Sequence, residues 1–167
     1  MTQFEISAAL VAALKERGMK IASVESCTAG LISKIITDAP GSSDVFDLGI
    51  TTYSNEMKTR MVGVPKEILS AHGAVSPETA RAMAEGIRRV SGADIGVATT
   101  GIAGPGGGSP EKPVGLVYTA IATKEGTEVT RLMIDEPGAD RNYIRNTAAE
   151  IVILNVLAKL NGNESSI

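Results

Sequence analysis

The sequence has almost no aromatic residues and few side chains that bind metals or form disulfides. It contains no Trp, and only 3% of its 167 residues are aromatic. This argues against a surface that stacks the bases of single-stranded nucleic acid, which needs aromatic faces. A single Cys rules out an intrachain disulfide, and one Cys with one His argues against a protein-only zinc site. We therefore expect no bound metal and a reducing compartment.

Long apolar runs and a strong charge of either sign are also lacking. The most apolar stretch, residues 151–160, is too short to cross a bilayer and contains Asn155 and Lys159. The first residues lack the basic and apolar regions of a signal peptide, so we expect a cytoplasmic protein that does not enter a membrane. The formal net charge of −3 attracts neither nucleic acid nor anionic lipid, and an anionic substrate would need a local cationic pocket.

The chain does have the composition of one globular domain. Hydrophobic residues make up 43% and charged residues 21%, enough to bury one aliphatic core. Helical and strand patterns alternate: helices are predicted over 4–17, 31–37, 56–61, 65–69, 77–90 and 140–160, and strands over 20–24, 46–53, 94–99, 116–123 and 128–134. This order predicts one domain over 1–167, with a fraying tail at 161–167. The fold class is α/β, a three-layer α/β/α sandwich around a mixed sheet.

The first predicted strand ends in a turn of small polar residues, Glu25-Ser26-Cys27-Thr28-Ala29-Gly30, which opens a helix. Such a turn places hydroxyls beside free backbone N–H groups, where it can hold a nucleophile, stabilise an oxyanion or bind a phosphate. The alternative is that Ser26 or Thr28 only caps the helix. The turn is not the Gly-x-Ser-x-Gly elbow of the α/β-hydrolases, so that mechanism is not implied.

A serine nucleophile needs a base, and the sequence offers two candidates. His72 is the only His, but it ends a predicted helix, where a structural role is favoured. A lysine replaces His where burial holds it neutral, and Lys58 lies on the helix that follows Tyr53. Because strand ends gather at one edge of a sheet, Lys58 could meet Ser26. The alternative is that Lys58 is a solvated surface lysine.

Two further segments are candidates for ligand binding. Residues 99–109 follow a strand and are rich in glycine, which allows close ligand approach, although the segment lacks the Lys-Ser/Thr of a P-loop. A flexible connector is the alternative, yet a long loop in a compact domain is more often functional. Arg141 and Arg145 lie four apart near the start of the last helix, which would suit an anion such as phosphate. Two solvated arginines paired with acids are the alternative.

In this order, the motifs resemble the CinA C-terminal domain family. The resemblance spans roughly residues 24–145 and rests on the segments 25–30, 41–43, 52–58, 73–76, 101–107 and 112–115. Members of this length resemble an amidase that converts nicotinamide mononucleotide to nicotinic acid mononucleotide and ammonia. Two positions depart from the pattern: Val24 and Ala29 stand where the family often has Ala and Gly, and Ala29 restricts the turn slightly.

The resemblance implies a Ser/Lys amidase, with Ser26 as nucleophile and Lys58 and Tyr53 as its activating partners. The implied substrate-binding residues are Thr28, Ser42, Ser43, Thr100, Gly101, Gly104, Arg141 and Arg145. The expected partner is a small-molecule nucleotide substrate, with no cofactor, no metal and no nucleic acid. A homodimer is an expectation that rests on no residue of the sequence. The alternative function is a non-catalytic nucleotide-binding or regulatory domain that has kept the pocket.

Overall fold

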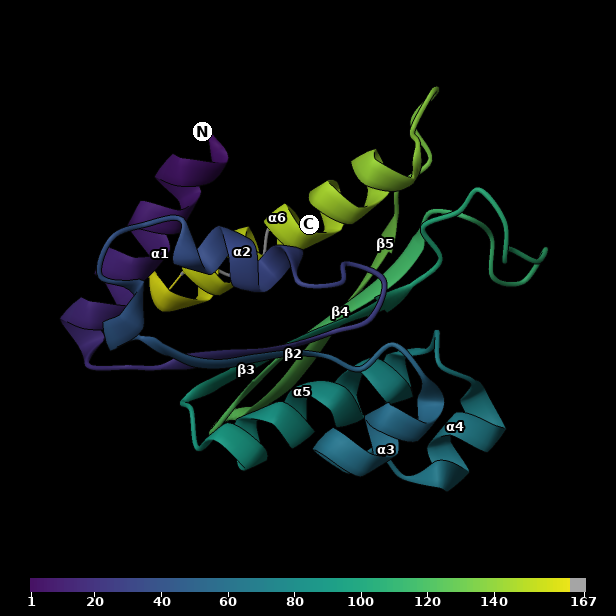
Figure 1. Ribbon diagram of the computed structural model, residues 1–167, viewed down its shortest axis with the longest axis horizontal. Coiled ribbons are helices and arrows are strands. Elements are labelled where there is room, and N and C mark those ends of the chain that lie inside the picture. Colours follow the sequence, from purple (N-terminus) through teal and green to yellow (C-terminus); the bar gives the residue numbers. More distant parts are fainter. Residues whose placement is uncertain (163–167) are drawn as a thin grey trace.

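A computed structural model describes residues 1–162 as a five-stranded sheet between two layers of helices (Figure 1). The strands are β1 (Ile21–Glu25), β2 (Phe46–Thr51), β3 (Ile95–Gly101), β4 (Leu116–Thr123) and β5 (Gly126–Met133). The helices are α1 (Gln3–Arg17), α2 (Leu31–Thr37), α3 (Asn55–Val62), α4 (Lys66–His72), α5 (Pro77–Ser91) and α6 (Arg141–Leu160), and a short 3-10 helix η1 (Ser42–Asp44) precedes β2. Most of the tail expected at 161–167 lies outside the described residues.

The sheet is mixed, with the strand order β2-β1-β3-β4-β5. Strands β2, β1 and β3 are parallel, whereas β4 and β5 pair antiparallel to the strand before them. The last two strands form the hairpin expected from the sequence, although β5 begins at Gly126 rather than at Glu128. The predicted α/β/α sandwich around a mixed sheet is therefore confirmed.

Each face of the sheet is covered by its own set of helices. Helices α1, α2 and α6 pack together on one face, and α5 lies along the other with α3 and α4 beside it (Figure 1). Successive side chains of a strand point to opposite faces. Ile21 and Ile95 accordingly pack in the cluster of α1, α2 and α6, while Ala22 and Ala98 pack against α5. These aliphatic layers form the core that the sequence predicts.

The helices begin and end at the residues that their capping chemistry favours. The side chains of Thr2, Ser54, Ser76 and Asp140 each accept a backbone N–H in the first turn of the helix that follows. Gly18 ends α1 in the left-handed conformation, at a φ of 61°. No helix among residues 1–162 is both long enough and apolar enough to span a bilayer.

The connections around β1 and β3 place a crevice at one edge of the sheet. From β1 the chain runs through α2 to β2 on one side, and it then returns through α3, α4 and α5 on the other face to β3. Such a reversal opens a crevice outside the carboxyl ends of the central parallel strands, where open α/β sheets bind their ligands. The turns that follow β1, β2 and β3 meet at this edge.

Candidate active site

The candidate nucleophile Ser26 directly follows β1, in the turn that leads to α2. Its backbone N–H donates to the carbonyl of Thr99 in β3 at 3.1 Å, so the turn is joined to the neighbouring strand. Its side chain is 8% exposed and lines an open cavity of about 270 Å³ at the carboxyl ends of the strands. The serine is therefore accessible to a small ligand on one side only.

Lys58 reaches the same cavity from α3, which lies on the face of the sheet that α5 covers. Helix α3 begins where the Ser54 side chain accepts the N–H of Met57 at 3.2 Å. Lys58 lies one turn after Ser54, and Lys58 and Val62 are the two buried residues of this helix. Lys58 is 1% exposed, so the alternative of a solvated surface lysine is wrong.

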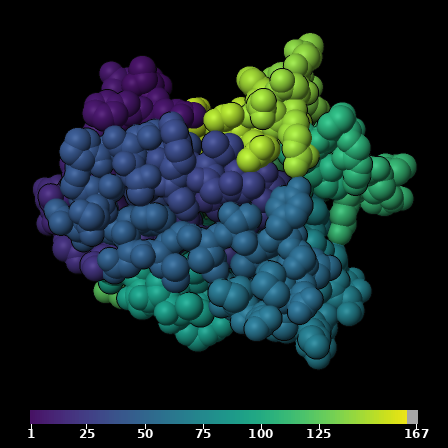
Figure 2. Space-filling model, viewed as in Figure 1, coloured from purple at the N-terminus to yellow at the C-terminus, as the bar shows by residue number. Residues whose placement is uncertain are grey.

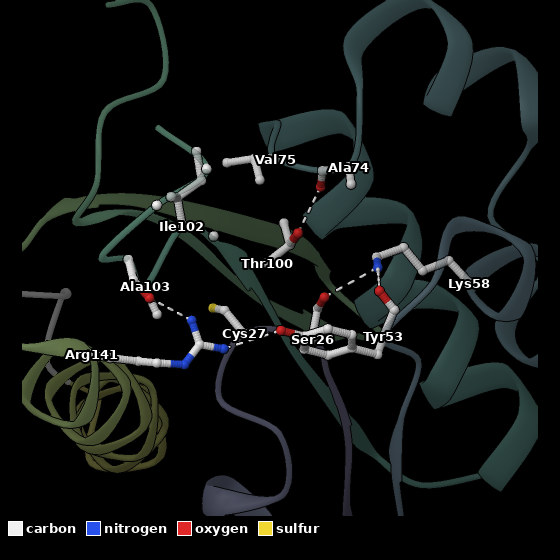
Figure 3. A pocket seen from close by; sticks show the side chains of 14 residues that line it. Ser26, Cys27, Tyr53, Lys58, Ala74, Val75, Thr100, Ile102, Ala103 and Arg141 are labelled. Carbon is white, nitrogen blue, oxygen red and sulfur yellow. Dashed lines mark hydrogen bonds between the residues drawn. The ribbon is translucent and has the colours of Figure 1, made fainter. Parts of the chain in front are cut away.

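The amine of Lys58 has three oxygen partners and no carboxylate among them. Its Nζ lies 3.1 Å from Ser26 Oγ and 3.3 Å from the carbonyl oxygen of Tyr53 (Figure 3). It also lies 2.9 Å from the carbonyl oxygen of Thr52. Burial without a counter-ion lowers the pKa of Lys58 below its ordinary value, because desolvation disfavours the charged form. The contact between Lys58 and Ser26 that the sequence led us to expect is present.

This geometry suits a neutral amine as well as an ammonium group. A carbonyl oxygen can only accept, so two N–H bonds of Lys58 are directed at Thr52 and Tyr53. In the neutral amine the remaining position holds the lone pair, which faces Ser26 Oγ and can accept its proton. The arrangement can therefore convert a serine hydroxyl into a nucleophile without a histidine.

The neighbouring Cys27 is a poor competitor for this role. Its side chain lines the cavity but is only 5% exposed and packs in an apolar cluster with residues that include Val117 and Ile144. Burial is the main cause that raises the pKa of the Cys27 thiol to about 12. Because the thiolate is the nucleophilic form, this cysteine stays unreactive at neutral pH.

Tyr53 and Arg141 meet at the mouth of the cavity. The Tyr53 side chain is 61% exposed, and its phenolic oxygen accepts a hydrogen bond from Arg141 at 3.1 Å. A second guanidinium nitrogen of Arg141 donates to the Gly104 carbonyl at 2.7 Å, so the arginine also holds the glycine-rich loop. Tyr53 thus contacts Lys58 through its backbone carbonyl, whereas its phenol points to Arg141 (Figure 3).

The glycine-rich segment forms the remaining wall of the cavity and projects from the body of the molecule (Figure 2). Thr100, Gly101 and Gly104, which the resemblance implies as substrate-binding residues, line the cavity. The Thr100 hydroxyl donates to the Ala74 carbonyl at 2.7 Å, which fixes the segment between α4 and α5 against β3. The Gly101 position has no room for a side chain, since an added Cβ would lie 2.7 Å from the Leu116 carbonyl oxygen.

Four residues expected to bind substrate do not line this cavity. Thr28 is fully buried, and its hydroxyl bonds to Glu25 and Thr99. Arg145 donates to the Thr28 carbonyl at 3.3 Å and so contacts the turn between β1 and α2. Ser42 and Ser43 lie in η1, just before β2 begins, and so at the opposite end of the sheet from Ser26. The expectation that they line this cavity was wrong, because β2 separates η1 from the edge of the sheet where Ser26 lies.

His72 has a structural place, as the sequence suggested. It ends α4, where its carbonyl accepts a hydrogen bond from Lys112 at 2.7 Å and its ring lies 3.6 Å from Glu78. It is not one of the residues that line the cavity. Within residues 1–162, no group of three or more His, Cys, Asp or Glu side chains is arranged to hold a metal ion.

Glu25, which was not among the residues expected at the site, has a defined place beside it. This carboxylate is fully buried at the end of β1 and accepts hydrogen bonds from the start of α2. Gly30 occupies the N-cap position of α2, and Glu25 supplies the side-chain acceptor, so the alternative that Ser26 or Thr28 caps the helix is wrong. An acid directly before a small-residue turn that opens a helix is a signal that could have identified it, because helix starts favour negative charge.

Comparisons with known proteins agree on one family. Residues 3–160 match the CinA C-terminal domain. A competence-damage inducible protein of Caldanaerobacter subterraneus subsp. tengcongensis is 57% identical over 141 residues, and a CinA-like protein of Anaeromyxobacter sp. (strain K) is 50% identical over 145 residues. These matches cover 84% and 87% of this chain but only 34% and 35% of the relatives. The chain thus spans about a third of the length of these curated relatives.

A solved structure matches almost the whole chain. The competence/damage inducible protein CihA from Agrobacterium tumefaciens has a TM-score of 0.90 and 39% sequence identity, with 95% of each chain covered. A competence-damaged protein (CinA) superfamily protein from Klebsiella pneumoniae has a TM-score of 0.91 and 29% identity. The five-stranded sandwich is thus the fold of these proteins as well.

Proposed function

Because the chain belongs to the CinA C-terminal domain family, we propose that it hydrolyses the carboxamide of nicotinamide mononucleotide to nicotinic acid mononucleotide and ammonia, and so recycles pyridine nucleotides. The observation that carries the reaction type is the buried Lys58 amine, 3.1 Å from Ser26 Oγ and without a carboxylate partner. The choice of substrate rests on the family resemblance of the motifs that line the cavity.

The proposed reaction proceeds in two halves. Neutral Lys58 takes the Ser26 proton while Oγ attacks the carboxamide carbon, and a backbone N–H of the turn after β1 would stabilise the oxyanion. The C–N bond then breaks, and protonated Lys58 gives its proton to the departing nitrogen, which leaves as ammonia. In the second half, water loses a proton to Lys58 and attacks the acyl-serine. The bond to Ser26 Oγ then breaks, Lys58 returns the proton to Oγ, and the acid product loses its own proton to the solvent.

The substrate phosphate is proposed to bind at the mouth of the cavity, near Arg141. This arginine is exposed at the first position of α6, where the helix start also favours an anion. The nicotinamide ring would then extend inward between Ser26 and the wall formed by residues 101–107. The expected homodimer stays a prediction, which sedimentation of the purified chain would check.

Ammonia release from nicotinamide mononucleotide, measured in the presence of a chelator, tests the proposal. We expect turnover by the unmodified chain, and near-complete loss in Ser26→Ala and in Lys58→Ala while the nucleotide still binds. The double variant should be little worse than either single one, because the two residues act as a unit. If Ser26→Ala keeps near-native turnover, the serine is not the nucleophile. If the unmodified chain binds the nucleotide without releasing ammonia, the alternative of a non-catalytic nucleotide-binding domain applies.

A chelator that abolishes turnover reversibly would reject the Ser/Lys scheme. In that case metal-activated water would be the nucleophile, and readdition of the metal would restore ammonia release. We expect turnover to survive dialysis against the chelator, because the proposed steps use only the hydroxyl, the amine and backbone N–H groups. Inductively coupled plasma mass spectrometry of the dialysed protein is the matching control, since it reports whether metal was removed.

A further inference from the structure

We propose that Glu25 is a positioning residue of this site, whose carboxylate holds the turn that presents Ser26 to Lys58. The inference rests on the proposed Ser/Lys function, and it adds a residue that touches neither the substrate nor the reacting atoms. Glu25 is fully buried, although it directly precedes the candidate nucleophile. A buried carboxylate beside a reactive serine requires a structural reason, because burying such a group without partners is costly.

The carboxylate accepts five hydrogen bonds, all from residues 28–33. Its Oε2 faces the Thr28 hydroxyl at 2.6 Å and the backbone N–H groups of Gly30 and Ile32, each at 3.0 Å. Its Oε1 accepts from the Ser33 N–H at 3.0 Å and from the Ser33 hydroxyl at 3.1 Å. Every group that faces the two oxygens is a donor, so Glu25 ties the end of β1 to the whole first turn of α2.

The turn between these anchors has a backbone that needs such support. Ala29 has a φ of +49° and Gly30 a φ of +99°, two consecutive residues in a conformation that an alanine rarely adopts. Gly30 occupies the position of the N-cap but has no side chain to accept the exposed N–H groups of α2. Glu25 supplies that acceptor from the strand. Without the Glu25 carboxylate, the backbone between Ser26 and Ile32 would lose the hydrogen bonds that hold it to the end of β1.

The carboxylate acts on Ser26 through the turn and not on Lys58 through charge. Its donors all lie on the side of α2, whereas the Lys58 amine approaches from α3 on the other face of the sheet. Lys58 has no hydrogen bond to Glu25 among its contacts, and its amine keeps only neutral oxygen partners. The carboxylate also accepts the backbone N–H groups at the start of α2, so these groups are not free to bind a substrate phosphate.

Substitution of Glu25 should lower the rate constant more than it weakens substrate binding. In Glu25→Gln an amide NH₂ replaces one acceptor and faces donors, so the turn must shift. We expect kcat for nicotinamide mononucleotide to fall about 100-fold, the loss typical of a reacting group displaced by about 1 Å, with KM changed less than threefold. The acid limb of the pH profile should stay in place, since the environment of Lys58 is unchanged. A shift of that limb would mean that Glu25 acts through charge, which would overturn the positioning role.

A milder variant and a remote control keep the test decisive if Glu25→Gln folds poorly. Thr28→Val removes one donor to Glu25 and should lower kcat about tenfold, again with little change in KM. Ser7→Ala removes a buried hydroxyl that accepts the Ala39 N–H and donates to the Ile36 carbonyl, at the far end of α2. It should lower the melting temperature without lowering kcat. Equal kcat losses in Ser7→Ala and Thr28→Val would reduce Glu25 to a general stabiliser and reject the proposal.

Labelling of Ser26 separates a failure of this inference from a failure of the proposed function. Phenylmethanesulfonyl fluoride adds its sulfonyl group to a serine Oγ as fluoride leaves and the hydroxyl proton passes to the base. Intact-mass spectrometry follows the rate, with Ser26→Ala as the unlabelled control. Slower labelling in Glu25→Gln than in Ser7→Ala supports the positioning role, even if nicotinamide mononucleotide is not the substrate. Labelling at the unmodified rate in Glu25→Gln would reject the positioning role and leave the Ser/Lys pair intact.

Discussion

Lys58 combines full burial with an amine that contacts three neutral oxygen atoms, and both features affect its proton equilibrium. Carbonyl groups stabilise an ammonium group far less than a carboxylate would, so desolvation controls the direction of the pKa shift. Burial makes the neutral, proton-accepting form more accessible near physiological pH. A solvated lysine, in contrast, would be almost entirely protonated there.

The pH dependence of turnover follows from this shift. We expect kcat/KM for nicotinamide mononucleotide to rise with pH as Lys58 loses its proton, and to level off above its lowered pKa, which lies below that of a free lysine. Lys58→Arg should be inactive at every pH, because a guanidinium group is not deprotonated in proteins. Steady-state rates across the stable pH range measure this. A profile that falls as pH rises through the neutral range would contradict Lys58 as the base.

Arg141 gives a second prediction for a single residue. If its guanidinium binds the substrate phosphate, Arg141→Ala should raise KM for nicotinamide mononucleotide about 10- to 100-fold, the range of one charged hydrogen bond, with a smaller effect on kcat. The KM for nicotinamide riboside, which lacks the phosphate, should change little in Arg141→Ala. Arg81→Ala is the matched control, because Arg81 is exposed on α5 and donates to Thr127 in β5. An unchanged KM for the nucleotide in Arg141→Ala would remove this residue from the phosphate site.

Among the elements, α3 owes its position to a glycine in α5. A Cβ at Gly86 would lie 2.0 Å from the Val62 carbonyl oxygen, so only glycine lets the end of α3 pack this closely on α5. Helix α3 carries Lys58 one turn before Val62, and the same contact therefore holds the amine at its distance from Ser26. Helix packing at this point thus controls the geometry of the site.

Gly86→Ala should destabilise the protein and lower its activity together. We expect a loss of about 1–3 kcal/mol in the free energy of unfolding, typical of an overpacked core, even though alanine favours a helix more than glycine does. Urea unfolding and ammonia release measure the two effects. Gly106→Ala is the control for stability, since a methyl group there meets nothing within 4 Å. If Gly86→Ala keeps the free energy of unfolding of the unmodified chain, α3 and α5 can move apart without loss of stability, and the prediction is wrong.

The elements themselves were largely predictable from the sequence, because their signals are local. Ser54, Ser76 and Asp140 each cap the helix that was expected to follow them. Glu25 was missed because its role depends on a side chain that reaches from a strand to helix residues seven and eight positions later. Hydrophobic periodicity does not report such a contact. Hydrophobic periodicity also misplaced the end of β2, since Tyr53 was expected inside the strand but lies beyond it.

At the scale of the whole molecule, the site depends on which strand ends share an edge. Ser26, Lys58, Thr100 and Arg141 come from four separate segments, and the strand order brings them to one cavity. The sequence could order these motifs along the chain but not place them in space. Ser43 shows the consequence, because its motif lies between two site motifs in sequence and yet at the opposite end of the sheet.

The stability of the whole molecule should also record the burial of Lys58. Its pKa is lower in the folded protein than in the unfolded chain. Between these two values the unfolded state holds a proton that the folded state does not, so the free energy of unfolding rises with pH. The window begins at the lowered pKa and ends near pH 10, about the pKa of a free lysine. At pH values below this window Lys58 adds none of this contribution to the free energy of unfolding, and at pH values above the window it adds all of it.

Lys58→Met should remove this contribution. The free energy of unfolding of the unmodified chain should increase across the window, by at most about 1.4 kcal/mol per pH unit for one proton, and the increase should be smaller in Lys58→Met. The absolute stability of the variant is a poor guide, because the Thr52 and Tyr53 carbonyls lose a donor. Urea unfolding at several pH values between neutral and pH 10 gives the slopes. Lys124→Met, at a side chain that is 83% exposed, should keep the slope of the unmodified chain. Equal slopes in Lys58→Met and Lys124→Met would show that Lys58 has the same proton affinity in the folded and unfolded states.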